Sequence, residues 1–320
     1  MMCKLGLLWA MVILGAACGS GIGAVPATAH TPRTDLSSRQ RGRSAAGDSA
    51  PVLLAVGDIA DCRSSGDEAT AAVIRRLRGT IATLGDNVYR SGSAREYADC
   101  YGPTWGMEKA RTRPVPGNHE YGTPRARGFF GYFGAASGDH GTGYYSYDLG
   151  AWHVVALNSN CEAIGGCTAN SAQGQWLRAD LARHPATCTL AYWHHPLFSS
   201  GKTHGGDAAM RPIWKLLYAA GADVVLSGHE HNYERFAPQD PGGLPDPARG
   251  IREFVVGTGG ESHYGFGKPL PTSERRNADT YGVLALTLHP TGYDWAFVPA
   301  GRGGSPRNHA FTDNGSGTCH

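Results

Sequence analysis

The chain repeatedly places a short apolar run directly before a cluster of polar residues. The runs over residues 51–56 and 80–84 are each followed by Gly-Asp, which puts Asp58 and Asp86 just beyond them. Apolar runs of this length, bounded by turn residues, are typical of strands buried in a sheet. In open α/β sheets, functional groups collect outside the carboxyl ends of such strands. The pattern therefore predicts an α/β (α+β) fold with a site built at strand ends.

Segments with helical periodicity and hairpins lie between these runs. Residues 67–79 end in arginine and glycine, and residues 171–184 begin with a capping serine, as helices do. Residues 143–160 read as two strands joined by a tight turn, and a hairpin is expected around residues 290–292. This mixture of βαβ units and hairpins indicates sheets covered by helices, in one domain over residues 51–312.

The first 29 residues have the features of an export signal. Lys4 is followed by an apolar stretch over residues 5–17, and Ala-Thr-Ala at residues 27–29 gives a cleavage site. The stretch is shorter than the roughly 20 residues that span a bilayer, so no membrane span is expected. Secretion is the preferred interpretation, and a lipid anchor at Cys18 is the alternative.

Two other segments are expected to lie outside the folded domain. Residues 30–50 are rich in Ser, Thr, Arg, Ala and Gly and cannot bury a core, which predicts a disordered linker. Residues 313–320 are expected to be a short C-terminal tail.

Charge and cysteine content narrow the class of protein. The formal net charge is only +2 over 320 residues, so no strong field favours nucleic acid or an acidic partner. Neither a nucleic-acid-binding module nor a protein partner is evident. Six cysteines follow the signal, and an even number in an exported chain indicates three disulfides. Six cysteines allow fifteen pairings, and their number does not choose among them.

Five polar motifs are candidates for a single site, because each follows an apolar run. They are "GDIAD", "GDNVY", "GNHE", "WHHP" and "GHEHNYER". Any one of them alone would be an ordinary turn, but five at strand ends, all rich in nitrogen and oxygen donors, indicate a built site. Their carboxylate, amide and imidazole groups suit hard or borderline metal ions.

In content and order these motifs resemble the calcineurin-like metallophosphoesterases, over about residues 51–260, and more closely their purple acid phosphatase branch. Asp-x-His is typical of the wider superfamily, but here Ala60 stands where that histidine is expected after Asp58. Tyr89, three residues beyond Asp86, stands where the purple acid phosphatase branch has a tyrosinate ligand. The resemblance is to a bacterial-type, secreted, single-domain member. It implies a four-layer α/β/β/α sandwich of two mixed sheets flanked by helices.

The resemblance also implies two metal positions that share one carboxylate. The first would be held by Asp58, Asp86, Tyr89 and His231, and the second by Asp86, Asn118, His194 and His229. His194 is chosen over His195 because the family's ligand stands two residues before a proline. A phenol has an unperturbed pKa of about 10, so a tyrosinate needs a strongly Lewis-acidic ion. The expected cofactors are therefore Fe(III) and a divalent ion, which is Zn, Mn or Fe.

Two further histidines are expected to act on the substrate. His119, beside Asn118, matches the family's histidine that donates to substrate oxygen and acts as general acid. His204, ten residues beyond His194, lies on a loop where family members often have a substrate-contacting histidine. Candidates for hydrogen-bond partners of the ligands are Glu120, Asn87, Asn158 and Glu230.

The function implied by the resemblance is hydrolysis of phosphate monoesters, by attack of a metal-bound hydroxide, in a secreted enzyme that acts on small molecules. The same metal pair serves diesters, so a phosphodiesterase of nucleotides or phospholipid head groups is one alternative. A catalytically silent extracellular binding protein is the other.

Proximity suggests a scheme for the disulfides. Cys161 and Cys167 are six residues apart in a glycine-rich loop and are expected to pair. Cys62 and Cys100 follow Asp58 and Asp86, whose strand ends must meet at the metals, so they are the next expected pair. Cys188 and Cys319 remain.

Overall fold

The computed structural model describes residues 50–138, 141–301 and 311–320, all within the unit Asp48–His320. The predicted signal peptide, and all of the predicted linker except residue 50, lie outside the described residues.

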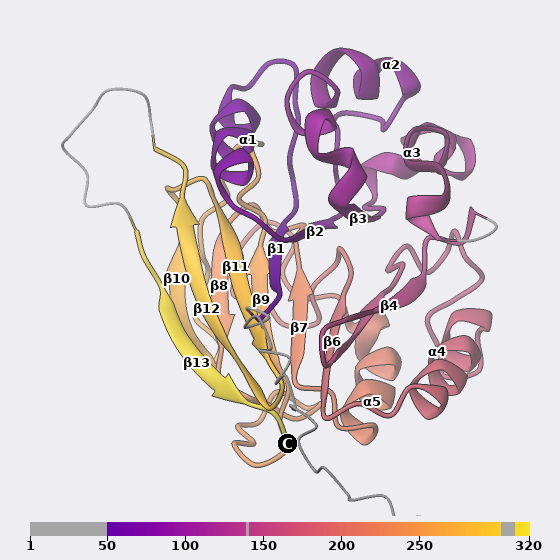
Figure 1. Ribbon diagram of the computed structural model, residues 1–320, viewed down its shortest axis with the longest axis vertical. Helices are drawn as coiled ribbons and strands as arrows, with labels where there is room; N and C mark the ends of the chain where they lie inside the picture. The colour runs from indigo at the N-terminus through magenta and orange to yellow at the C-terminus, as the bar shows by residue number, and fades with distance from the viewer. Residues whose placement is uncertain (1–49, 139–140, 302–310) are drawn as a thin grey trace, which may run out of the picture. The chain divides into compact units, whose positions relative to one another are not determined.

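Two mixed β-sheets form the centre of the domain (Figure 1). The first has the order β13 (Asn314–Thr318), β12 (Gly292–Pro299), β11 (Gly282–His289), β1 (Val52–Val56), β2 (Thr80–Leu84), β3 (Thr112–Val115). The second has the order β10 (Ser273–Asn277), β8 (Tyr233–Phe236), β9 (Arg252–Val256), β7 (Val224–Ser227), β6 (Cys188–Tyr192), β5 (Trp152–Ala156), β4 (Tyr145–Leu149). Strands β1–β3 are parallel to one another, as are β5, β6, β7 and β9.

Helices cover the outer faces of the two sheets. On the first sheet they are α1 (Gly66–Arg76), α2 (Ala94–Glu96), α3 (Arg127–Phe133) and the short helical turns around α2 and α3; on the second they are α4 (Ala172–Arg183) and α5 (Arg211–Ala219). This arrangement confirms the expected four-layer α/β/β/α sandwich. Within the described residues, no helix is both long and apolar enough to cross a bilayer.

Successive side chains in the strands of the second sheet point alternately into two hydrophobic clusters. Leu190 and Tyr192 of β6 belong to the cluster that fills the space between the sheets, whereas Ala191 and Trp193 pack with the residues of α4 and α5. Successive side chains of a strand point to opposite faces, so a strand covered on both sides needs apolar residues throughout. This is why the sequence shows continuous apolar runs here rather than alternation.

The C-terminal residues differ from expectation. Residues 313–320 were expected to be a tail, but Asn314–Thr318 form β13, which pairs with β12 from Gly292↔Thr318 to Ala296↔Asn314. Asp313 accepts hydrogen bonds from the Tyr233 hydroxyl (2.8 Å) and from Arg235 Nε (2.7 Å). Backbone hydrogen bonds and the contacts of Asp313 hold this strand in place. It therefore needs no apolar side chains, and its Asn, Gly, Ser and Thr residues give no pattern that predicts a strand.

All three expected disulfides are present. They join Cys62 to Cys100, Cys161 to Cys167 and Cys188 to Cys319. The last bridge joins the start of β6 in the second sheet to the residue that follows β13 in the first.

Candidate metal centre

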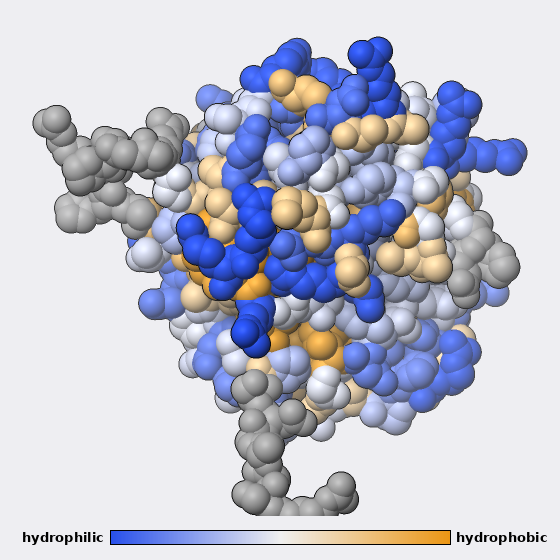
Figure 2. All heavy atoms as spheres, turned by 45° about the horizontal axis from the view of Figure 1, so that its top comes forward, coloured by the Kyte–Doolittle hydropathy of each residue, from blue (hydrophilic) through white to orange (hydrophobic). Residues whose placement is uncertain are grey.

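The polar motifs of both sheets meet where their parallel strands end. The strands β1 and β2 run level, with Val56 opposite Thr83, so Asp58 and Asp86 emerge at the same edge of the first sheet. His194 follows β6 in the second sheet, and its Nδ1 donates to the carbonyl oxygen of Leu84 at the end of β2 (2.8 Å). The backbone N–H of His229, just past β7, donates to Asp58 Oδ2 (2.8 Å). The face of the molecule at this end is mostly hydrophilic, with scattered apolar patches (Figure 2).

Three of the clustered residues have left-handed backbone conformations. Asp58, Asp86 and His229 have φ values of 61°, 46° and 70°. A non-glycine residue in this region costs of the order of 1–3 kcal/mol and persists only where the surroundings enforce it. The coincidence of three such residues in one place indicates that the loops are shaped for the site rather than for stability.

Glycines in the motifs allow the loops to approach one another closely. A Cβ atom at Gly117 would lie 2.2 Å from Asp86 Oδ1, and one at Gly85 would lie 2.7 Å from the His194 ring. The φ of Gly85 is also +84°, a conformation that side chains other than glycine rarely adopt. These two glycines are therefore required by the packing of Asp86 and His194.

One set of ligand atoms surrounds the hydroxyl of Tyr89. The Tyr89 Oη atom lies 2.8 Å from Asp58 Oδ1, 3.2 Å from Asp86 Oδ2 and 3.1 Å from His231 Nε2. His231 Nε2 is itself 3.4 Å from Asp58 Oδ1. These four residues are the ones expected for the first metal position.

A second set of ligand atoms surrounds Nε2 of His194. This nitrogen lies 3.2 Å from Asp86 Oδ2, 3.1 Å from Asn118 Oδ1 and 3.1 Å from His229 Nδ1. Asp86 Oδ2 belongs to both sets, as expected for a bridging carboxylate. Nitrogen and oxygen ligands lie about 2.0–2.2 Å from an ion such as zinc, so neighbouring ligand atoms stand roughly 3–3.5 Å apart. The observed spacings fit two adjacent ions.

Hydrogen bonds to backbone carbonyls aim lone pairs of two histidines into the centre. His194 Nδ1 donates to Leu84 O, and His231 Nδ1 donates to Ser262 O (2.6 Å). A carbonyl can only accept, so in each neutral ring the Nε2 lone pair faces the carboxylates. Such fixed tautomers are characteristic of metal-ligating histidines. Nitrogen lone pairs and carboxylate oxygens that face one another at about 3 Å need a proton or a metal ion between them.

The pKa shifts of His194, Asp86 and Tyr89 also indicate that positive charge stabilises this centre. Burial alone would lower the pKa of His194, but the carboxylate of Asp86 outweighs burial and raises that pKa to about 9. The pKa of Asp86 is held far below its usual range, because His194 and His119 offset the cost of burial. Burial and the nearby Asp58 carboxylate raise the pKa of Tyr89 well above its ordinary value. A phenolate at Tyr89 therefore needs a highly charged ion to offset both effects.

Glu120 holds the loop that carries Asp86. Its buried carboxylate accepts hydrogen bonds from the backbone N–H groups of Asp86 (3.0 Å), Asn87 (2.9 Å) and Gly117 (2.6 Å), and from the Tyr97 hydroxyl (3.0 Å). Burial, with a smaller contribution from Asp86, raises the pKa of Glu120 to about 7. Glu120 thus fixes the Asp86 turn without reaching either set of ligand atoms.

His119 faces the centre from its open side. Its backbone N–H donates to Asp86 Oδ1 (2.9 Å), and its Nδ1 donates to the carbonyl oxygen of Arg90 (2.6 Å). Its Nε2 lies 3.9 Å from Asp86 Oδ2. Because Nδ1–H is bonded to the Arg90 carbonyl, Nε2 is the ring nitrogen that faces the centre.

The loop that carries His204 is anchored by Glu230. Glu230 lies between His229 and His231 in the chain, and its Oε1 accepts from the N–H groups of Thr203 (3.2 Å), His204 (2.5 Å) and Gly205 (2.7 Å). The exposed His204 ring packs 4.2 Å from the His229 ring, centroid to centroid. The loop thereby brings a second histidine to the rim of the centre.

His195 lies near the second set of ligand atoms, although it was expected only to pack beside it. A ring nitrogen of His195 lies within 4.8 Å of ligand atoms of His194 and His229. However, its Nδ1 is hydrogen-bonded to Ser159 Oγ (2.7 Å), which also accepts from the His195 backbone N–H (3.0 Å). Burial, and then His194, lower the pKa of His195 to about 3, so the ring is neutral.

Three of the four expected hydrogen-bond partners support loops rather than metal ligands. Glu230 holds the His204 loop, the Asn87 side chain donates to Val115 O (3.0 Å), and Asn158 donates to the Tyr121 hydroxyl (2.8 Å). Sequence reasoning missed Tyr264, whose ring stacks on His231 with centroids 4.0 Å apart. Tyr264 belongs to no motif and is brought to the site only by the fold.

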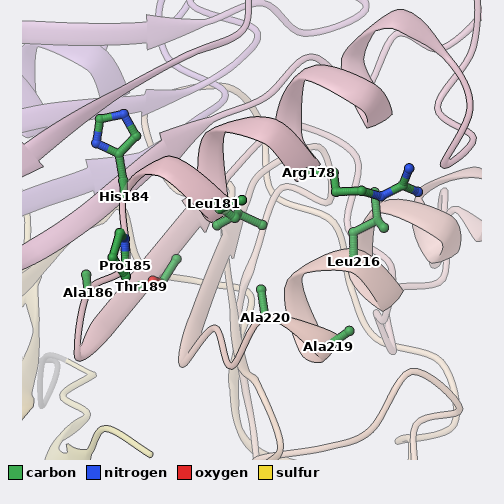
Figure 3. A pocket seen from close by; sticks show the side chains of 10 residues that line it. Arg178, Leu181, His184, Pro185, Ala186, Thr189, Leu216, Ala219 and Ala220 are labelled. Carbon is green, nitrogen blue, oxygen red and sulfur yellow. The ribbon is translucent and has the colours of Figure 1, made fainter.

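A separate pocket of about 440 Å³ lies between α4 and α5, and none of the residues of the candidate metal centre lines it. It is lined by side chains such as Leu181, Leu216 and Ala220, with Arg178 and His184 at its sides (Figure 3).

Residues 51–233 match the family model of calcineurin-like phosphoesterases. Among curated relatives, purple acid phosphatase 21 of Arabidopsis thaliana is 34% identical over 221 residues, which cover 60% of this chain and 49% of that one. Purple acid phosphatase 22 of the same plant is 36% identical over 148 residues, which cover 42% and 32%. The chain thus spans about half, or less, of the length of these relatives.

Solved structures share the fold at low sequence identity. A purple acid phosphatase from yellow lupin seeds has a TM-score of 0.67 at 17% identity, covering 84% of this chain and 53% of that one. GAP50 of Plasmodium has a TM-score of 0.61 at 16% identity, covering 83% and 88%.

The shared carboxylate gives a prediction that also tests the choice between the adjacent histidines. Asp86→Ala should sharply lower the content of both metal ions, because both sets of ligand atoms lose Asp86 Oδ2. His195→Ala should retain a metal content close to that of the wild type. The measurement is elemental analysis of the purified proteins, with circular dichroism to establish that both are folded. Equal and severe loss of metal in the two variants would contradict this assignment.

Proposed function

Since the chain belongs to the calcineurin-like phosphoesterase family, we propose that it is an exported phosphatase that hydrolyses phosphate monoesters at a binuclear metal centre. The observation that carries this proposal is the pair of ligand sets that share Asp86 Oδ2. The names of the curated relatives, which are purple acid phosphatases, support the same activity.

We assign the two positions to Fe(III), held by Asp58, Asp86, Tyr89 and His231, and to a divalent Zn, Mn or Fe ion, held by Asp86, Asn118, His194 and His229. When bound, such a pair supplies Lewis acidity that activates water and neutralises charge on the phosphoryl oxygens. The fit rests on the donor groups. The first set has a phenol oxygen, two carboxylates and an imidazole, and the second has the shared carboxylate, an amide oxygen and two imidazoles.

His119 is proposed to protonate the leaving group. The carbonyl of Arg90 holds Nδ1–H, so the transferable proton is on Nε2, which faces the centre. His119 is also only half-buried, as a group that must meet a substrate has to be. His204 is proposed to contact the bound phosphate ester from its position beside His229, with Glu230 holding its loop.

Small phosphate esters are the proposed substrates, and export to an oxidising compartment is the proposed location. Three disulfides among the described residues support export, since such bonds persist outside the reducing cytosol. The predicted signal peptide supports it independently.

The test is to purify the protein, determine its metal content and compare the turnover of matched monoesters and diesters. We expect two metal ions per chain and faster turnover of monoesters. Faster turnover of diesters would assign the centre to a phosphodiesterase. Full metal occupancy without turnover of either class would assign the chain to a binding role.

A second prediction concerns the proton donated by His119. His119→Ala should leave the metal content near normal and lower turnover by roughly 10²–10⁴-fold, the usual contribution of general acid–base catalysis. The loss should shrink for esters with good leaving groups, because these need little protonation. Turnover of a series of aryl phosphates measures this dependence; a uniform loss across the series would assign His119 to positioning instead.

A third prediction concerns Tyr89 and iron. If Tyr89 binds Fe(III) as a phenolate, the oxidised protein should be violet or pink through ligand-to-metal charge transfer. Tyr89→Phe retains the ring and its packing, so it should remove the colour and weaken binding of the first ion while leaving the fold nearly as stable. Visible absorption, iron content and thermal unfolding of both proteins provide the measurement. A colourless, fully active wild type loaded with zinc or manganese alone would refute the iron–tyrosinate assignment and leave the phosphatase proposal standing.

A further inference from the structure

A second cluster of histidine and carboxylate side chains lies on the edge of the second sheet, and it shares no residue with the centre. Asp148 of β4 and His153 of β5 are directly opposite each other in the antiparallel pair. Asp180 and His184, one turn apart at the end of α4, pack over them. Two strands and a helix therefore contribute to one cluster.

His153 is held with one ring nitrogen directed inward and one outward. Its Nε2 lies 2.9 Å from Oδ2 of the buried Asp180, whose other oxygen accepts from Ser146 Oγ (2.9 Å). Its Nδ1 lies 2.9 Å from Oδ1 of Asp148, whose side chain is 66% exposed. Burial opposes charge on the ring, but the hydrogen bonds to Asp180 and Asp148 outweigh burial and raise the pKa of His153. The buried Asp180 holds the proton on Nε2, so Nδ1, which faces the exposed Asp148, is the nitrogen whose proton a metal ion would replace.

His184 completes a set of three ligand groups. One ligand atom each from Asp148, His153 and His184 lies within 4.8 Å of the others. The His184 ring lies parallel to the His153 ring, with centroids 4.8 Å apart and planes 3° apart. Lone pairs lie in the ring plane, so His184 must turn about its side-chain torsions to share an ion with His153. Its side chain is 43% exposed and ends a helix, so it has room to do so.

A cavity of about 440 Å³ opens on the outward side of this cluster. Its lining includes Asp148, His153 and His184 but not Asp180. The space therefore borders the three ligand groups, and Asp180 lies behind them. Arg183 also borders the cavity, but its guanidinium is 61% exposed and lies 3.8 Å from Asp180 Oδ1.

We propose that Asp148, His153 and His184 form a second, peripheral site for a divalent transition-metal ion such as Zn²⁺. Two imidazoles and a carboxylate are a donor set that zinc and neighbouring ions bind well, with water completing the coordination. Asp180 is a positioning residue for His153. The ion joins the β4–β5 edge of the sheet to the end of α4, so it stabilises the folded chain by an amount that rises with the logarithm of the ratio of free ion concentration to Kd.

The test uses Zn²⁺ and the purified protein without its predicted signal peptide. We expect wild-type protein saturated with Zn²⁺ to carry one more ion per chain than His184→Ala, and its melting temperature to rise more on addition of Zn²⁺. His289→Ala is the matched control. Its side chain is 42% exposed and pairs with Asp294 across a hairpin (2.8 Å), as His184 pairs with Asp180. Among the described residues, however, His289 belongs to no group of three possible ligands. This control should retain the extra ion.

Asp148→Ala provides an independent check, because it also removes a surface ligand without disturbing Asp180. It should weaken Zn²⁺ binding at this site at least tenfold in competition with a chelator. Equal stoichiometry and equal thermal shifts in wild type, His184→Ala and Asp148→Ala would overturn the proposal. The comparison does not depend on activity at the central site, so failure of the proposed function leaves this test intact.

Discussion

One oxygen atom, Oδ2 of Asp86, determines the arrangement around it. It is within 3.2 Å of Tyr89 Oη on one side and of His194 Nε2 on the other, inside a region that water hardly reaches. A buried carboxylate facing further oxygens and nitrogen lone pairs is tolerable only with positive charge nearby. In the absence of ions, His194 supplies that charge by holding a proton. A metal ion at the proposed position would take the place of this proton, so proton and metal ion would compete for it.

Both sheets are needed to place this atom. Asp86 follows a strand of the first sheet, whereas His194 and His229 follow strands of the second. The hydrogen bond from His194 Nδ1 to the Leu84 carbonyl joins the two sheets at the site. Glu120 then fixes the Asp86 turn through three backbone N–H groups. The interface between the sheets is therefore part of the site and not merely its support.

The sequence predicted the features that depend on local pattern. Buried strands such as β1, β2 and β7 have continuous apolar runs, and the clustered ligand residues sit in short motifs beside them. The sequence did not indicate β10 or β13, because these edge strands are polar and are held mainly through backbone hydrogen bonds. Tyr264 was also missed, since it reaches His231 from a position about thirty residues away in the chain and belongs to no motif.

The position of β1 in its sheet has a consequence for biosynthesis. One neighbour, β2, follows it closely in the chain, but the other, β11, begins only at Gly282 and is translated much later. Until then one edge of an apolar strand stays unpaired, and an open edge of this kind is a template for pairing with other chains. If the chain is exported from its N-terminus as proposed, that edge must stay covered until β11 has emerged. Premature termination before β11 would leave the edge open permanently, so truncated products should aggregate rather than fold into a smaller domain.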